Sequence, residues 1–316
     1  MKKIAQLMLL LLALAWHAAA AEPENFIPKQ APGVIRININ RMLTSPELKE
    51  ILDNNKEIKK LVDAVNDMLQ NASGSKLKLS DIFSSQLWIA QTGKKQKDVT
   101  AYCKTALPEK VLQAVVSKNP ACKVVSVAGK KAFVYERAGK NLVVIYLADD
   151  VLMLSRLSDR LPQEVTASLQ GGGNPLLSTI DRQMLAAGAV DMAAVTGKRK
   201  PKIRFISGKL DFNKALDLTS QVMLHCKSSK EALKMAMQIQ IAAPGLIGMF
   251  FSKDENLAAA LAEGLQVTPQ NDAIIIDYSL KYTDFQKAVK YMSKAENRPQ
   301  LPENKGIGPE IKQEKK

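Results

Sequence analysis

The pattern of apolar and polar positions predicts short strands combined with amphipathic helices. Residues 34–39 read Val-Ile-Arg-Ile-Asn-Ile and alternate between apolar and polar from Ile35 onward, which is typical of a half-buried strand. We expect the isoleucines of this strand to face the core, and Arg36 and Asn38 to face away from it. Residues 46–70 instead carry apolar side chains three and four positions apart. That spacing predicts a long amphipathic helix.

The remainder of the first half is predicted to contain further strands and two shorter helices. Turn residues at Gly129-Lys130, Gly139-Lys140 and Asp149-Asp150 divide a long apolar stretch into antiparallel strands. The expected elements are strands at 86–92 and 99–105, a helix at 108–117, strands across 122–155 and a helix at 159–169.

The second half follows a glycine-rich linker at 171–175. The expected elements are a helix at 176–185, strands at 190–196, 202–210 and 215–226, two helices between 228 and 265 with a break near Pro244, a strand at 273–282 and a helix at 283–292. Capping boxes predict the starts of the two middle helices, with Ser228 paired to Glu231 and Ser252 paired to Glu255. Along 215–226, alternation places Cys226 toward the core and His225 toward solvent.

These elements favour an α+β fold of two lobes, each an antiparallel sheet with helices packed on one face. The chain has no glycine-rich dinucleotide fingerprint and no regular alternation of strand and helix, so a doubly wound parallel sheet is not expected. A degenerate structural repeat is suggested by residues 88–92, which resemble 192–196. We expect an N-terminal lobe at 22–170 and a C-terminal lobe at 174–295.

Both ends of the chain are expected to lie outside the lobes. Two lysines precede an apolar run that ends at Trp16 and is followed by four alanines, the pattern of a secretory signal peptide over 1–21. Cleavage is expected near Ala20 or Ala21. The alternative is an uncleaved anchor, but the apolar run is short for a hydrocarbon core of roughly 30 Å. We therefore expect a periplasmic or secreted protein, with residues 296–316 as a disordered tail.

Composition and charge narrow the choice of partner. Hydrophobic residues make up 46% of the chain and charged residues 24%, which is ordinary for a globular protein, and the formal net charge is +14. An exported cationic protein meets anionic lipid, lipopolysaccharide, acidic glycan or acidic protein before it meets nucleic acid. We expect an anionic envelope component as partner, and no transmembrane segment in the mature chain.

The densest group of cations lies just before and within one predicted strand. It is interpreted either as the solvated end of a hairpin or as a binding patch for an anionic partner. No aromatic residues alternate with the cations, as they would on a stacking platform for single-stranded nucleic acid. The candidate patch consists of Lys198, Arg199, Lys200, Lys202 and Arg204.

Three cysteines remain after the predicted signal peptide: Cys103, Cys122 and Cys226. In an oxidising compartment an odd number leaves at least one thiol free or paired between chains. Cys103 and Cys122 flank a predicted helix and are placed on two strands that could be neighbours. We therefore consider a disulfide between them, with Cys226 as the unpaired thiol.

The sequence contains little that indicates catalysis. After loss of His17, His225 is the sole histidine, which excludes zinc sites built from two or three histidines. His225 and Cys226 should point to opposite faces of a strand, so they are not a base and nucleophile pair. Asp149-Asp150 is better explained as a turn than as a glycosidase pair. No catalytic, cofactor-binding or metal-binding residue is therefore assigned.

The sequence leads to three functional hypotheses. The first is a non-catalytic binding or interaction protein of the cell envelope. The second is an envelope-polymer hydrolase that uses carboxylates, which requires two acidic side chains in one cleft. The third is a carrier of an apolar ligand such as a lipid, because the methionines and phenylalanines between 235 and 251 could line an apolar groove.

Overall fold

The computed structural model describes residues 21–45, 48, 63, 86–93, 98–117, 122–137, 140–197 and 201–293. The predicted signal peptide up to Ala20 and the predicted tail lie outside the described residues. The predicted helix over 46–70 also lies outside them, apart from Leu48 and Asp63.

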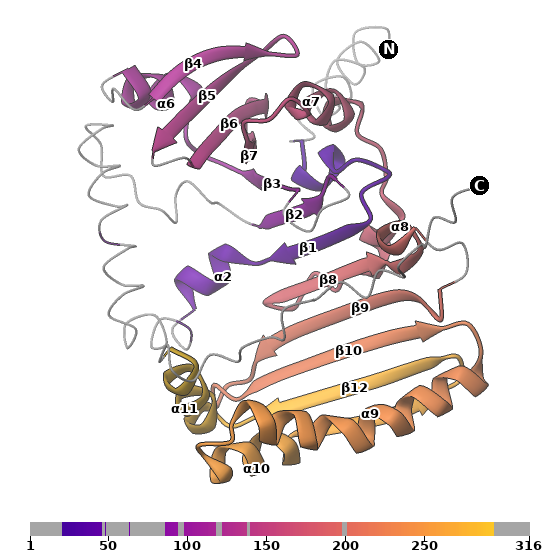
Figure 1. The fold of residues 1–316 in the computed structure, drawn as a ribbon. Helices are drawn as coiled ribbons and strands as arrows, with labels where there is room; N and C mark the ends of the chain where they lie inside the picture. The colour runs from indigo at the N-terminus through magenta and orange to yellow at the C-terminus, as the bar shows by residue number, and fades with distance from the viewer. Residues whose placement is uncertain are drawn as a thin grey trace, which may run out of the picture.

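The described residues form one antiparallel sheet of twelve strands with helices packed against it, which confirms the α+β prediction (Figure 1). The strand order is β11-β12-β10-β9-β8-β1-β2-β3-β7-β6-β5-β4. The strands are β1 (Gly33–Ile37), β2 (Leu87–Gln91), β3 (Val99–Lys104), β4 (Cys122–Val127), β5 (Lys130–Arg137), β6 (Lys140–Ala148), β7 (Val151–Arg156), β8 (Ala186–Asp191), β9 (Ile203–Phe212), β10 (Leu218–Cys226), β11 (Leu265–Gln270) and β12 (Ala273–Leu280).

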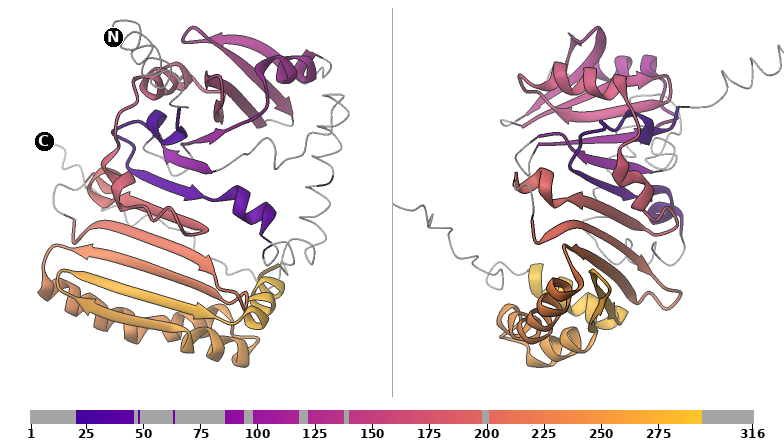
Figure 2. Two further views of the ribbon diagram at one scale, coloured as in Figure 1. Left: turned by 180° about the vertical axis from the view of Figure 1, so that it is seen from behind. Right: turned by 90° about the vertical axis from the view of Figure 1, so that its right-hand side faces the viewer.

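The helices lie on both faces of this sheet and at its ends. The longest, α9, lies along the β11–β12 end, and α7 lies toward the opposite end (Figure 2). The helical elements are η1 (Pro23–Phe26), α2 (Ile39–Thr44), α6 (Glu109–Ser117), α7 (Leu161–Gln170), η2 (Pro175–Thr179), α8 (Met192–Thr196), α9 (Ser229–Phe250), α10 (Glu255–Glu263) and α11 (Tyr282–Ser293).

The sheets of the two predicted lobes join edge to edge, because β1 pairs with β8 along its whole length. The order on one side of this junction is β1-β2-β3-β7-β6 and on the other β8-β9-β10-β12-β11. In both halves a short helix follows the first strand directly, capped by an Asn or Asp side chain: Asn38 for α2 and Asp191 for α8. The two halves therefore repeat one topology, with β4 and β5 as an addition to the first.

The residue match suggested for this repeat is wrong. Residues 88–92 include most of β2, whereas 192–196 form α8. The carboxylate of Asp191 accepts hydrogen bonds from the backbone N–H of Ala193 at 2.8 Å and Ala194 at 3.2 Å, which starts a helix where alternation predicted a strand. By topology the counterpart of β2 is β9.

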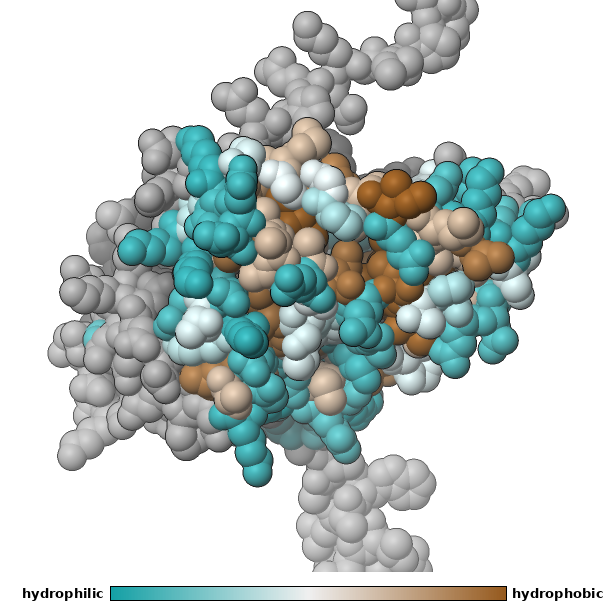
Figure 3. Space-filling model, turned by 90° about the horizontal axis from the view of Figure 1, so that it is seen from below, coloured by the Kyte–Doolittle hydropathy of each residue, from teal (hydrophilic) through white to brown (hydrophobic). Residues whose placement is uncertain are grey.

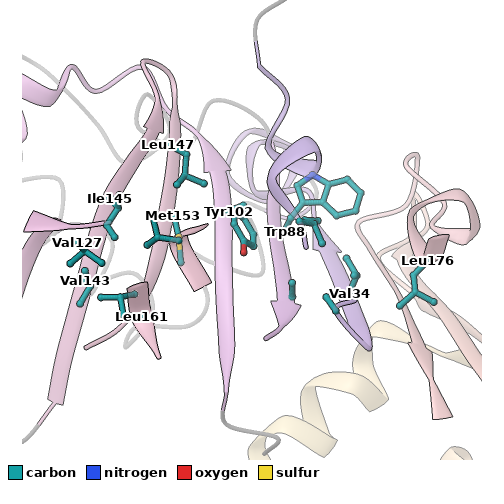
Figure 4. Packing of buried hydrophobic residues seen from close by; sticks show 14 of the residues in the cluster. Val34, Trp88, Tyr102, Val127, Val143, Ile145, Leu147, Met153, Leu161 and Leu176 are labelled. Atoms are coloured by element: carbon teal, nitrogen blue, oxygen red, sulfur yellow. The ribbon is translucent and has the colours of Figure 1, made fainter. Parts of the chain in front are cut away.

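The two halves bury opposite faces of the sheet. In the N-terminal half, the main core lies on the face covered by η1, α7 and η2, where Trp88, Tyr102 and Met153 lie in a row across adjacent strands (Figure 4). A smaller cluster around Cys103 lies on the other face, together with residues of α6. In the C-terminal half, the core lies on that second face, beneath α9 and α10. The first face of β9, β10 and β12 carries mostly polar side chains, together with Phe205, Met223 and Ile275, and η2 and α8 border it near the start of β9.

The faces of β1 are the reverse of the prediction. Arg36 is fully buried, opposite Trp88, while Ile35 is 46% exposed. Arg36 is satisfied because its Nε donates to Gln86 Oε1 and its Nη1 to the carbonyl of Met184, both at 2.9 Å. Burial lowers the pKa of Arg36. Alternation identified the strand but not its buried face. Which face of this central strand is buried depends on residues that are remote in sequence, such as Gln86 and Met184.

Other boundaries differ from the prediction for local reasons. The helix expected at 176–185 is reduced to η2. α9 continues through Pro244 without a break, and the second middle helix is capped by Asp254, whose side chain accepts from the N–H of Leu257 at 3.0 Å, not by Ser252. Strand β11 was not predicted: the second middle helix was expected to continue to 265, and no element was assigned to 266–272. Pro269 lies in this strand. It is an edge strand, where proline is tolerated.

Candidate functional site

The inner side of α9 packs closely on the sheet because it carries small residues. Ala232 and Ala236 are buried one turn apart against Val267 and Ile274, with Ile239 half-buried beside them. The Ser228 side chain accepts a hydrogen bond from the N–H of Glu231, as predicted, and fixes the start of the helix. These contacts determine which side of α9 faces outward.

A polar contact also fixes α9 against the edge strand. The side-chain Nε2 of Gln240 donates to the carbonyl of Val267 at 2.7 Å, and Val267 belongs to β11. β11 pairs with β12 on one side only, so this hydrogen bond satisfies one carbonyl of the open sheet edge. The helix is thus held along the edge of the sheet over much of its length.

The outer side of α9 is apolar and exposed to solvent. From Met235 to Ser252 the sequence has no ionisable side chain. The large exposed side chains, with their exposed fractions, are Leu233 (53%), Met237 (55%), Ile241 (79%), Leu246 (52%), Met249 (76%) and Phe250 (38%). Seen from the α9 end, the molecule shows apolar side chains bordered by hydrophilic ones (Figure 3). On a helix with 3.6 residues per turn, Leu233, Met237, Ile241 and Met249 fall on one side, whereas Leu246 and Phe250 fall on the side of Ala232 and Ile239, nearer the end of the helix. We call Leu233, Met237, Ile241 and Met249 the α9 outer face.

Exposed lysines lie at the N-terminal end of this face. Lys230 and Lys234 are one turn apart on α9, and both are exposed. In the described part of the chain, neither forms an ion pair with a carboxylate. An apolar surface bordered by free cations is typical of helices that bind at an anionic lipid interface.

α9 is the one described helix that is long and apolar enough to cross a membrane, judged by length and composition alone. Its packing on β11 and β12 argues for a different orientation. A crossing helix would have to leave the sheet and expose the cluster around Ala236 and Ile274, together with the edge carbonyl of Val267. The packing therefore favours a helix that lies parallel to a surface.

The predicted cation patch is only partly within the described residues: Lys198, Arg199 and Lys200 lie outside them. Lys202 and Arg204 are both exposed. The Nη2 of Arg204 pairs with Asp272 Oδ2 at 2.6 Å, and its Nε donates to the carbonyl of Cys226 at 3.1 Å. Arg204 therefore has a fixed position where β9 begins and β10 ends.

The cysteines and the histidine are separated in the structure. Cys103, Cys122 and Cys226 are free thiols. The disulfide prediction assumed neighbouring strands and is wrong on that point, because β7, β6 and β5 lie between the strands of Cys103 and Cys122. Burial raises the pKa of Cys103 to about 12. Cys226 is buried under α9, whereas His225 lies on the opposite face against Phe205, with ring centroids 5.2 Å apart.

The carboxylates considered for a glycosidase pair have other roles in the described part of the chain. Asp149-Asp150 forms the β6–β7 turn, as predicted. Asp211 and Asp277 line a shallow pocket of about 340 Å³ on the first face of the sheet. Asp211 lies on β9 and Asp277 on β12, which is two strands away, and the two positions are offset by two residues along the strands. Their Cα atoms are therefore about 12 Å apart. Asp211 pairs with Arg41 at 2.8 Å, and Asp277 accepts from a side-chain amide at 2.8 Å.

Residues 235–251 do not line a single groove. Met235 packs inward and Phe251 packs on Tyr291, with ring centroids 5.0 Å apart, whereas Met237 and Met249 point outward. Among the described residues, no three His, Cys, Asp or Glu side chains gather as a metal site would require. The α9 outer face could not be predicted from the sequence, because apolar residues occur on every side of this helix. Only the packing of the helix on the described sheet and on α10 shows which of its side chains stay exposed to solvent.

Comparisons with known proteins add little to this geometry. The sequence matches no protein-family model and no curated protein. One solved structure with a similar fold is titled "Structure of crystal form I of TP0453". It is 12% identical, with a TM-score of 0.47, and the match covers 86% of this chain and 97% of that one. A likeness this weak does not indicate a shared function.

Proposed function

We propose that this chain is an exported, non-catalytic binding protein that attaches to the anionic surface of a lipid membrane through the α9 outer face. The observation that carries the proposal is the exposure of four large apolar side chains on one side of α9, three of them within the stretch from Met235 to Ser252 that has no ionisable side chain. The expectation of export rests on the sequence of residues 1–21. A membrane is therefore the large apolar and anionic partner within reach of the mature protein.

The exposed apolar area is large enough to drive reversible binding. A fully buried Leu, Ile, Met or Phe side chain contributes about 1.5–3 kcal/mol. The exposed fractions of the four side chains then correspond to roughly 4 kcal/mol on insertion, once incomplete burial is allowed for. Ile241 contributes most per residue because 79% of it is exposed.

Lysines supply a second, electrostatic contribution. Each Lys or Arg close to an anionic leaflet contributes about 1 kcal/mol, and the effect decays within a Debye length. Lys230 and Lys234 lie on the same helix as the apolar side chains, so both groups reach the surface in one orientation. Salt should weaken the binding without abolishing it, because the apolar contribution does not depend on ionic screening.

A matched pair of variants tests the proposal. Ile241→Asp and Gln163→Asp each add one negative charge to an exposed helical position, but only Ile241 belongs to the α9 outer face, since Gln163 lies on α7 toward the opposite end of the sheet. We expect wild type to co-sediment with vesicles of phosphatidylethanolamine and phosphatidylglycerol. Ile241→Asp should weaken the partition coefficient about thirtyfold or more, from a loss of about 2 kcal/mol of apolar burial. Gln163→Asp should lower it by less than about fivefold.

Circular dichroism provides the folding control, since both positions are exposed. The proposal fails if wild type does not sediment with the anionic vesicles or if both variants bind equally well. It also fails if the α9 outer face instead pairs with a second copy of the chain. In that case light scattering would give a dimer that Ile241→Asp dissociates without any vesicle present.

A further inference from the structure

A pocket of about 630 Å³ opens beside α8, where β9 begins and β10 ends. This volume falls within the range of about 300–1,000 Å³ that is usual for small-molecule sites. Leu176 of η2, Ala193 of α8 and Phe205 of β9 form much of its apolar lining. The pocket draws its walls from segments that are far apart in sequence, so no local pattern indicates it.

The wall formed by η2 is held rigidly. Asn174, which is 3% exposed, donates from Nδ2 to the carbonyls of Pro28, Lys29 and Ala31 at 2.9, 3.2 and 3.0 Å. Its Oδ1 accepts from the N–H of Leu176 at 2.9 Å. These four hydrogen bonds fix the position of Leu176 before any ligand enters, which lowers the entropic cost of binding.

Phe205 and α8 complete the apolar part. Phe205 packs against the main core on one side and against the ring of His225 on the other. Asp191 also lines the pocket, and its Oδ1 accepts from the backbone N–H groups of Ala193 and Ala194. This oxygen of Asp191 therefore caps α8.

The charged side of the pocket is cationic. Arg204 and Lys227 both line it, and Lys202 lies two residues before Arg204. Asp272 binds one side of the Arg204 guanidinium. Lys227 is exposed and forms no ion pair within the described part of the chain. A guanidinium has five N–H donors, so Arg204 can bind an anion while it keeps its contact with Asp272.

We propose that this pocket binds one small anionic amphiphile, with its apolar body against Leu176, Ala193 and Phe205 and its carboxylate or phosphate head between Arg204 and Lys227. Of the predicted cation patch, Arg204 lines this pocket, and the proposal assigns it a definite class of ligand. It does not depend on membrane attachment by α9, because none of the α9 outer face lines the pocket.

Dodecanoate, used below its micelle concentration, is a suitable probe for calorimetric titration of the full mature chain. We expect saturable binding of one molecule per chain, with much weaker binding of dodecyltrimethylammonium, which carries the opposite charge. Dodecyl phosphate distinguishes between head groups. Binding of either anion supports the site, and the tighter of the two identifies the preferred head.

Two matched pairs of variants locate the site. Ala193→Trp fills the pocket and should weaken dodecanoate binding more than tenfold, whereas Ala194→Trp, on the exposed side of the same helix, should leave it unchanged. The double variant Arg204→Gln/Lys227→Gln should bind dodecanoate about tenfold more weakly, because each exposed charge contributes up to about fivefold to the affinity. Lys230→Gln/Lys234→Gln removes the same charge from α9 and should leave dodecanoate binding unchanged while it weakens vesicle binding.

The proposal is overturned if dodecanoate gives no saturable binding or if the cationic amphiphile binds as tightly. It is also overturned if Ala193→Trp binds like wild type. Failure here with normal vesicle binding leaves the α9 proposal standing, and failure of vesicle binding with normal dodecanoate titration leaves the pocket standing.

Discussion

Asn174 provides a quantitative test of how the fold holds the pocket wall. Asn174→Ala removes one helix cap and the shared donor of three backbone carbonyls. Loss of an N-cap costs about 1 kcal/mol. A buried carbonyl left without its partner costs about 1–3 kcal/mol, although these three share a single side-chain amide. We therefore expect the free energy of unfolding to fall by about 3 kcal/mol, which corresponds to a decrease in Tm of roughly 6 °C for a chain of this size.

Asn174→Asp should be more damaging than Asn174→Ala at neutral pH. The aspartate keeps an oxygen for the N–H of Leu176, but it places a carboxylate against three carbonyl oxygens where the amide donated. The difference between the free energies of unfolding of the two variants should become smaller as pH falls. A protonated carboxyl can donate one hydrogen bond, and burial beside carbonyls raises the pKa of such a group.

Urea unfolding followed by circular dichroism measures both effects. Asn213→Ala is the control, because Asn213 accepts from the N–H groups of Ala215 and Asp217 at 2.9 Å in an exposed loop where water can replace it. We expect this control to lose about 1 kcal/mol or less. The reasoning is refuted if Asn174→Ala costs no more than Asn213→Ala, or if Asn174→Asp is as stable as wild type at pH 7.

Two further predictions concern packing and titration. A Cβ at Gly264 would meet the carbonyl oxygen of Ser279, so Gly264→Ala should lower the free energy of unfolding by about 1–3 kcal/mol in thermal unfolding. Gly245→Ala, in open space on α9, should be neutral or stabilising. Equal effects of the two substitutions would contradict the close approach of Gly264 to β12. Because the pKa of Cys103 is raised from about 9 to about 12, the thiol stabilises the fold below pH 9 and this contribution is lost as pH rises toward 12. In urea unfolding, the free energy of unfolding should therefore fall less between pH 8 and 11 for Cys103→Val than for wild type. An equal fall in the two proteins would show that Cys103 is not buried as described.

The sequence predicted those elements whose pattern depends on local contacts. A stretch rich in Val, Ile and Tyr, divided by turn residues, located β4 to β7, and the Ser228 capping box located the start of α9. The face of β1 was not predictable in this way, since Arg36 is buried by partners at positions 86 and 184, which are remote in sequence. The strand predicted at 190–196 failed because one Asp191 side chain, by capping two N–H groups, outweighed a short apolar run.

The candidate site was predictable only in part. The run of cations before β9 was evident from the sequence, but the apolar pocket beside Arg204 is assembled from η2, α8, β9 and the end of β10. The apolar character of residues 235–251 was also evident. Whether these residues fill a core or face solvent depends on how many elements pack around α9, and in the described structure the sheet covers one side of it.

The central claim, that the α9 outer face enters lipid, is tested most directly by a fluorescent probe placed on it. An environment-sensitive dye is attached to a cysteine at position 241 of α9 or at position 163 of α7, in a chain whose half-exposed Cys122 is replaced by serine. We expect anionic vesicles to shift the emission of the dye at 241 to the blue and lipids with quenchers in their acyl chains to quench it, with a much weaker response at 163. The same emission with and without vesicles at position 241, or equal quenching at both positions, would contradict this claim.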